Sequence, residues 1–301
     1  MLSLHTNAAA LSAQNSISRT QMSLSTSQTR LSTGFRVNSA MDDAAGLQIA
    51  TRLKAQSSGM AMAMRNTQNS ISMLQTAEGA FDEVTTMLTR MKDLATQAAD
   101  ASSTAKDQAA LQSEFDALGS ELNNVMKNTT FGGAKLLDGG TIASSMTFQI
   151  GATKSETMSI DLSAAMTALT GTGLANVSAR YAAGGAAVGS EISDGTDGTA
   201  SASNAAGQTA ANNAIDTITT AIDMVGGVRS SLGAAANRLD HVYNNLSNIS
   251  TNTKAATGRI MDTDFASESS NMTSSQMLLQ AGTAMLKQSN STSSLVMSLL
   301  Q

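Results

Sequence analysis

Apolar residues recur at spacings of three and four along much of the chain, and this spacing predicts long α-helices. The most regular stripe has ten members, apolar except for Arg229: Ile215, Ile218, Ile222, Val225, Arg229, Leu232, Ala236, Leu239, Tyr243 and Leu246. Residues three and four apart lie on one face of a helix. Because the helix lacks the purely apolar length of a membrane span, we expect this face to pack on other helices.

A second long helix is predicted for residues 43–99, followed by a break at Ser102–Thr104 and an antiparallel helix at 105–127. Two rows with seven-residue steps form a seam in the long helix: Leu74, Phe81, Leu88 and Ala95, and Ala77, Val84, Met91 and Ala98. The shorter helix has the stripe Leu111, Phe115, Leu118, Leu122 and Val125. Both helices are the expected partners of the 215–246 stripe.

Both ends of the chain carry thinner stripes. One helix is predicted from Leu4 to Leu31, and the other ends the chain. Their large apolar residues are Ile17, Leu24 and Leu31, then Met272, Leu279 and Leu286, with Met285, Thr292 and Leu299 on a neighbouring row. Serine and threonine lie between them, so each helix alone would bury too little to stay folded. Residues 1–41 contain no acid and residues 269–301 only Lys287 as a charge, which favours burial against other subunits; disordered polar tails have a similar composition.

Two polar joints separate the terminal helices from the longer ones. Gly34 is expected to end the first helix, and Gly258 begins the second joint. The predicted joint residues are Arg36, Asn38, Asp42 and Asp43 on one side, and Asp262 and Asp264 on the other. In each pair of aspartates, one residue or the other is placed to cap the following helix.

Residues 146–162 predict a β-hairpin. Met146, Phe148 and Ile150 alternate with polar residues, the same alternation recurs from Met158 to Leu162, and residues 151–155 could form the turn. Residues 163–207 are rich in Gly, Ala, Ser and Thr and predict a surface insertion with little structure; a flexible loop without a task fits them equally well.

Composition agrees with a helical protein and disfavours several other classes. The 301 residues contain 3% aromatics and neither proline nor tryptophan, which suits packed helices better than a sandwich of sheets. Without cysteine there is no disulfide or thiolate site. The net charge of −5 and the absence of a basic patch disfavour nucleic acid. We see no secretory signal and no run of 18 apolar residues, so we expect no membrane insertion.

An enzyme is poorly supported. His5 and His241 have no neighbouring set of metal ligands, and neither a zinc-protease motif nor a phosphate-binding loop occurs. Asp82 and Glu83 are better explained as a solvated helix face than as an acid/base pair. We therefore predict no catalytic residues, no metal and no cofactor.

Four segments carry a family resemblance: TGFRVNSAMDDAAGLQIA near the N-terminus, TTFGGAKLLDG, ASESSNMTSSQMLLQAGTAMLKQSN, and the final LVMSLLQ. They closely resemble bacterial flagellins, the subunits of the flagellar filament, over about residues 1–162 and 208–301. Flagellins usually have a proline near Thr292. Its absence here could extend the last helix.

The resemblance implies a mainly α fold with long antiparallel helices. Residues 1–42 and 259–301 would form an inner coiled coil. Residues 43–162, including the β-hairpin, and residues 208–258 would form a helical-bundle domain in the outer tube. Residues 163–207 would be a short variable surface insertion.

The resemblance also implies a function: an extracellular structural subunit that polymerises with itself for swimming motility. It implies export through the flagellar type III channel, a secretion chaperone at the C-terminal helix, and assembly beside cap and hook-junction proteins. The filament core would use the residues Ile17, Leu24, Leu31, Met272, Leu279, Leu286 and Leu299.

Further partners follow from the same resemblance. LTRMKDLATQ is similar to the flagellin helix read by a Toll-like innate receptor, so Arg90, Leu94 and Gln97, with Glu114, would contact it; subunit packing is the simpler alternative. As in some flagellins, O-linked sugars could be carried by Ser190, Ser193, Thr196, Thr199, Ser201 and Ser203.

Two other functions stay open. The hook-filament junction protein of the flagellum shares such terminal helices. A secreted, membrane-active helical translocator would also have amphipathic helices, although serine and threonine interrupt these stripes often.

Overall fold

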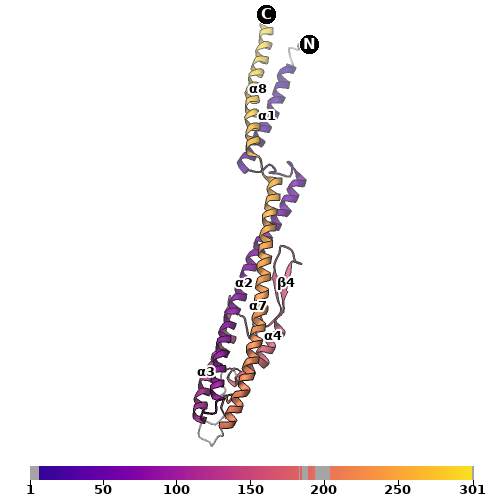
Figure 1. Ribbon diagram of the computed structural model, residues 1–301. Helices are drawn as coiled ribbons and strands as arrows, with labels where there is room; N and C mark the ends of the chain where they lie inside the picture. The colour runs from indigo at the N-terminus through magenta and orange to yellow at the C-terminus, as the bar shows by residue number, and fades with distance from the viewer. Residues whose placement is uncertain (1–6, 183, 185–188, 194–203, 300–301) are drawn as a thin grey trace. The chain divides into compact units, whose positions relative to one another are not determined.

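The computed structural model describes residues 7–182, 184, 189–193 and 204–299, with side chains of the last helix described as far as Thr292. The chain divides into two compact units. The terminal unit consists of Met1–Ser58 and Ile249–Gln301, and the central unit consists of Gly59–Asn248. Two helices contribute to both units, α2 (Ala44–Ala98) and α7 (Asn204–Met261). The described chain is mainly α-helical, as the sequence predicts (Figure 1).

The seam of α2 forms the middle of the central unit's core. All eight predicted seam positions between Leu74 and Ala98 are at most 1% exposed, which confirms this prediction. The spacing of three and four keeps them on one helical face. Burying a side chain such as Phe81 or Leu88 stabilises the folded state by about 1.5–3 kcal/mol.

The stripe of α7 is confirmed in one row and displaced in the other. The buried row contains Ile218, Val225, Leu232, Leu239 and Leu246. The predicted companion row, which includes Ile215 and Ile222, is only half-buried, because the residues Ala214 and Ala221 occupy the core instead. Arg229 belongs to this flanking row, and its guanidinium lies 3.0 Å from the carboxylate of Asp82. A charged residue is tolerated in the stripe because it lies at the edge of the packed face.

A capping box holds the turn between α2 and α3 (Ala105–Asn128). The Thr104 hydroxyl accepts a hydrogen bond from the backbone N–H of Asp107, whose carboxylate accepts the hydroxyl (2.6 Å) and the backbone N–H (3.0 Å) of Thr104. These bonds from the Thr104 hydroxyl and backbone hold the pKa of Asp107 below its usual value. The predicted helix break before residue 105 is confirmed.

The predicted β-hairpin is present, together with a smaller one. The four strands are β1 (Thr130–Phe131), β2 (Ala134–Lys135), β3 (Met146–Gln149) and β4 (Thr157–Ile160). In the larger hairpin Met146 lies opposite Ile160, and both are buried. β1 and β2 are joined by Gly132 and Gly133, whose positive φ angles suit glycine.

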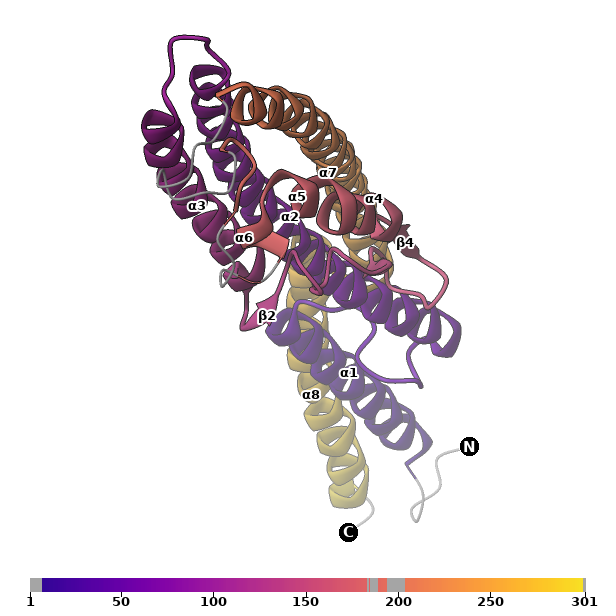
Figure 2. The same ribbon diagram turned by 90° about the horizontal axis from the view of Figure 1, so that it is seen from below.

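Residues 163–182 are more ordered than the sequence predicts. They form short helical segments: α4 (Ser163–Ala168), the π-helical turn η1 (Leu169–Gly173), α5 (Leu174–Val177) and α6 (Ala179–Ala182). Buried side chains of this region join the core: Met166, Leu169, Leu174, Val177 and Tyr181. Figures 1 and 2 both show α4 beside α7. The expectation of little structure here was wrong because irregularly spaced apolar residues among Gly, Ala and Thr give no periodic signal.

A buried polar cluster fastens the segment after α5 to α3. The Gln112 amide donates to the Glu191 carboxylate (2.8 Å) and accepts from the backbone N–H of Ile192 (2.8 Å). The Asp116 carboxylate, 6% exposed, lies 3.5 Å from the Arg180 guanidinium. Buried polar groups are favourable only with such partners, so this cluster fixes where the segment lies.

In the terminal unit, α1 (Ala8–Thr33) and α8 (Phe265–Leu299) run antiparallel to each other (Figures 1 and 2). Asn7 caps the start of α1, where its side chain accepts the N–H of Ala10. Gly34 ends the helix with φ of 75°, as predicted. The predicted start at Leu4 lies outside the described residues.

Candidate assembly interface

Large and small residues alternate where α1 and α8 face each other. The α1 positions are Ala10, Ala13, Ile17, Thr20, Leu24, Ser27 and Leu31, and the α8 positions are Glu268, Met272, Ser275, Leu279, Gly282, Leu286 and Ser289. Six of these residues were predicted to pack in the filament core, and all six are half-buried: Ile17, Leu24 and Leu31 on α1, and Met272, Leu279 and Leu286 on α8. Their packing in a filament stays a prediction. The side chain of Leu299 lies outside the described residues.

The small residues let the two backbones approach closely. A methyl group at Gly282 would lie 2.9 Å from Cγ1 of Ile17, closer than two carbon atoms normally pack. Serine, threonine and glycine contribute little apolar area, however. The seam therefore gives good steric fit but modest hydrophobic stabilisation.

Polar contacts fix the register at both ends of the pair. At one end, the Asn7 amide donates to the backbone carbonyl (3.3 Å) and the hydroxyl (3.2 Å) of Ser289. At the other, the Arg30 guanidinium lies 3.7 Å from the carboxylate of Glu268, a residue only 7% exposed. Sequence analysis missed Glu268, because an acid in the first turn of a helix is usually solvated.

The terminal unit exposes many large apolar side chains. They are Leu11, Met22, Phe35, Met41, Ile49, Ile249, Phe265, Met277, Leu278 and Met285, each between 39% and 97% exposed. In the described part of the central unit, Met62 alone is exposed to a comparable extent. Exposed apolar residues gathered in one region mark a surface that another molecule covers. These exposed side chains lie on several faces of the terminal unit, and together they make up the candidate assembly interface.

The predicted joint is a short backbone pairing within the terminal unit. Phe35 pairs with Asp262 as an antiparallel bridge. Arg36 donates its backbone N–H to the carbonyl of Met261 (2.6 Å), and its guanidinium donates to the carbonyl of Ile260 (3.0 Å). Arg36 therefore positions backbone groups rather than pairing with an acid.

One aspartate at each joint caps the helix that follows. Asp43 accepts the N–H of Gly46 (2.8 Å) at the start of α2. Asp264 accepts the N–H of Ala266 (3.0 Å) at the start of α8. The structure thereby resolves which residue of each predicted pair is the cap.

Asp42 and Asn38 hold the loop of the first joint. The Asp42 carboxylate accepts the backbone N–H groups of Ser39 (2.9 Å) and Asn38 (3.1 Å). The bond from Ser39 has the larger effect and the bond from Asn38 the smaller, and both hold the pKa of the Asp42 carboxyl below its usual value. The Asn38 amide in turn donates to the carbonyl of Phe35 (2.8 Å).

The four predicted receptor contacts are not equally accessible. The Arg90 guanidinium donates to the Glu114 carboxylate (2.6 and 2.9 Å), and both side chains are about half exposed. Gln97 is exposed. Leu94 is 1% exposed and lies in the core of the central unit. The receptor contacts stay a prediction.

The predicted sugar acceptors also differ. Ser190 is exposed, whereas Ser193 is 6% exposed. The remaining candidates, Thr196, Thr199, Ser201 and Ser203, lie outside the described residues.

No group of three or more metal-binding side chains occurs among the described residues. His241 is exposed, and His5 lies outside the described part of the chain. Among the helices of the described chain, none combines the length and apolarity needed to cross a bilayer.

Comparison with known proteins identifies the family. Residues 4–141 match the model for the bacterial flagellin N-terminal helical region, and residues 215–300 match that for the C-terminal helical region. The chain belongs to the bacterial flagellin family. Flagellin A of Vibrio anguillarum is 34% identical over 379 aligned residues, covering 100% of both chains. A flagellin of Halalkalibacterium halodurans is 39% identical and covers 90% of each chain.

A solved structure shares the flagellin fold. It is a chain from Vibrio parahaemolyticus described as a flagellar hook-associated protein, 20% identical, with a TM-score of 0.55 over 73% of this chain and 100% of that one. At this identity the likeness concerns the fold alone. As a flagellin, the protein is a structural subunit of the extracellular flagellar filament, formed by self-polymerisation.

Proposed function

We propose that this flagellin forms filaments by coupled folding and polymerisation of its terminal helices. The observation that carries the proposal is the exposure of large apolar side chains along the terminal unit. Neighbouring copies would cover these side chains. A head-to-tail contact between copies that does not close on itself produces a helical filament.

The marginal seam between α1 and α8 supports this mechanism. Ordering the 26 residues of α1 and the 35 residues of α8 costs about 1–2 kcal/mol of backbone entropy for each residue. The half-buried seam side chains offset little of this cost. Additional burial against neighbouring copies would supply the remainder in the filament.

Hydrogen exchange combined with electron microscopy tests the proposal. In dilute monomer, amides of α1 and α8 should exchange much faster than those in the α2 seam, and they should become protected in filaments. Removing Leu295–Gln301 should leave a folded monomer that forms no filaments. Terminal helices as protected in the monomer as α2, or normal filaments from the truncated chain, would contradict the mechanism. Short rings instead of long filaments would favour a hook-filament junction protein.

The domain roles belong to the same proposal. Residues 1–42 and 259–301 form the inner coiled coil, residues 43–162 and 208–258 the outer tube, and residues 163–207 a surface region. The buried packing of residues 163–182 supports a surface region anchored to the outer tube rather than a free loop.

The remaining partners are proposed from the family resemblance: export through the type III channel, a chaperone on the C-terminal helix, and contacts with cap and junction proteins. The exposed apolar face of α8 supports chaperone binding before assembly. For the innate receptor, Arg90→Ala should reduce activation by the monomer, with Thr86→Ala as an exposed control on the same helix. Unchanged activation would exclude Arg90.

A further inference from the structure

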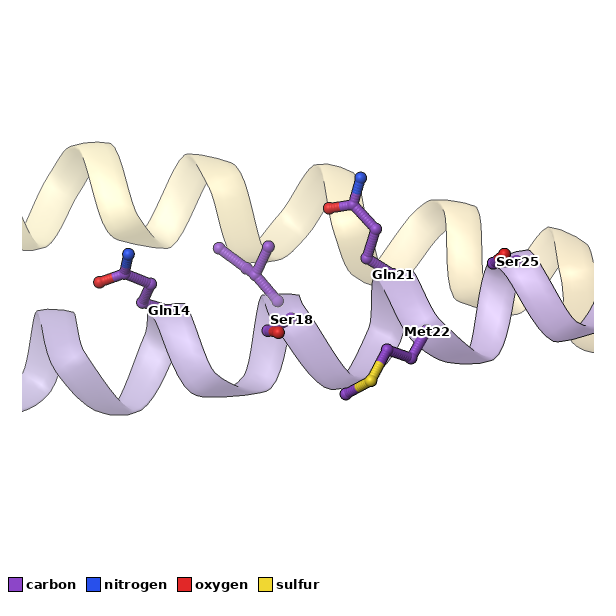
Figure 3. A pocket seen from close by; sticks show the side chains of 6 residues that line it. Gln14, Ser18, Gln21, Met22 and Ser25 are labelled. Atoms are coloured by element: carbon purple, nitrogen blue, oxygen red, sulfur yellow. The ribbon is translucent and has the colours of Figure 1, made fainter. Parts of the chain in front are cut away.

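A groove on α1 has walls from one helix only (Figure 3). It measures about 430 Å³ and is lined by Gln14, Ile17, Ser18, Gln21, Met22 and Ser25. Gln14, Ile17, Ser18 and Gln21 lie at positions i, i+3, i+4 and i+7. Ser18, Gln21, Met22 and Ser25 repeat this spacing. Four residues so placed form the hole that receives a knob in a coiled coil, so α1 carries two adjacent holes.

The helix α8 of the same chain does not fill these holes. Of the six lining residues only Ile17 also faces α8, at Gly282, and α8 runs alongside α1 in Figure 3. At 3.6 residues per turn, the centre of the groove lies about 100° around α1 from the row of Ile17, Leu24 and Leu31. The groove is therefore a second packing face, available to a third helix.

A matching stripe lies exposed on α8. Leu278 and Met285 are 62% and 68% exposed, and Ala281 lies exposed between them. Their spacing of three and four is that of successive knobs in a coiled coil. The stripe, like the groove, contains no charged residue. It lies about 100° around α8 from the seam with α1.

The groove and the stripe lie on opposite faces of the α1/α8 pair. When each helix is viewed along its axis from its own N-terminus, successive residues step clockwise by about 100°. In this view the groove lies clockwise of the seam on α1, and the stripe lies anticlockwise of the seam on α8. In an antiparallel pair of right-handed helices, such displacements lead to opposite sides. One copy cannot satisfy both of its own surfaces. Successive copies can, by a heterologous contact that repeats.

We infer that the α8 stripe Leu278–Ala281–Met285 of one copy packs antiparallel along the α1 groove of the next copy, with two consecutive members of the stripe entering the two holes. The inference rests on the proposed polymerisation and names its contact. Copies in a head-to-tail polymer point the same way, so α8 of one copy is antiparallel to α1 of its neighbour.

Disulfide cross-linking tests this contact, because the chain has no cysteine of its own. Ser18→Cys copies are mixed with copies carrying Leu278→Cys, Ala281→Cys or Met285→Cys, one partner bearing a short tag so that mixed dimers differ in size. Matched controls are Gln276→Cys and Thr283→Cys, exposed positions on the opposite side of α8. Each mixture is polymerised and then oxidised. Where Ser18→Cys copies fail to enter filaments, Ser25→Cys in the second hole replaces them.

Mixed dimers from at least one stripe position, absent with both controls and absent in dilute monomer, would support the inference. Filaments that yield no mixed dimer, or equal amounts from stripe and control positions, would overturn it and leave the proposed function intact. If the unmodified chain forms no filament, the proposed function fails and the inference fails with it.

Discussion

Replacing Leu278 by alanine separates assembly from folding. Its side chain is 62% exposed in the single chain, so most of its apolar surface makes no contact there. Alanine is at least as good a helix former as leucine. The substitution should therefore change the free energy of unfolding of the monomer by no more than about 0.5 kcal/mol.

The expected effect on polymerisation follows from the same exposed fraction. Complete burial of a leucine side chain contributes about 1.5–3 kcal/mol, and 62% of this is about 1–2 kcal/mol still available on assembly. With tenfold in an equilibrium constant for every 1.4 kcal/mol, the critical concentration for polymerisation should rise by roughly 5–30-fold.

Sedimentation of polymerised protein measures this critical concentration, and denaturant unfolding of monomer measures stability. Gln276→Ala is the matched control on the other side of α8 and should change neither quantity. Leu88→Ala, in the core of the central unit, should lower monomer stability by about 2–5 kcal/mol. A critical concentration unchanged by Leu278→Ala would show that assembly does not cover this side chain.

Three predictions concern the central unit. Gly59→Leu should displace the hairpin turn, since a methyl group at Gly59 would lie 2.7 Å from Cβ of Ala152. Amide exchange at residues 151–156 should become faster, and unchanged exchange there would refute this displacement. Thr104→Ala should cost about 1 kcal/mol of stability through the lost cap. The pKa of the Asp107 carboxyl is lowered on folding. Its contribution to stability is therefore present above the unfolded pKa of 3.8 and is lost as the pH falls through the lower pKa of the folded state. The loss of stability caused by Thr104→Ala should accordingly become smaller in acid. Asp116→Ala should cost about 1–3 kcal/mol by removing the acceptor of the buried Gly189 backbone N–H, with faster proteolysis after α5 as the check.

Periodicity predicted the parts of the fold whose packing is regular. The α2 seam from Leu74 to Ala98 was correct at every position, because a fully buried face needs apolar residues at each turn. In α7 the prediction followed the largest apolar residues and placed one row of the stripe incorrectly. Ile215 and Ile222 lie at the flank, and the buried face is shared by the Ile218 row and by a row that includes Ala214 and Ala221.

The rest depended on contacts distant in sequence. Nothing around Glu268 indicates that its carboxylate is buried beside Arg30. Gln112 and Asp116 have the spacing of a solvated helix face and are buried only because a later segment covers them. Leu94 was expected at a contact surface through family resemblance, but it occupies a core position.

Packing contributes differently in the two units: in the central unit it mainly provides stability, and in the terminal unit it mainly sets the alignment of α1 with α8. The α2 seam consists of apolar residues throughout, so the central unit has a core of its own. The seam between α1 and α8 alternates large apolar residues with serine, threonine and glycine. Its register is fixed by Asn7 with Ser289 and by Arg30 with Glu268. Partly buried ion pairs add little net stability but penalise a wrong alignment, which would leave Glu268 buried without a partner. The single chain can thus select the pairing of its ends, while in the proposed mechanism neighbouring copies would supply the burial that stabilises this pairing.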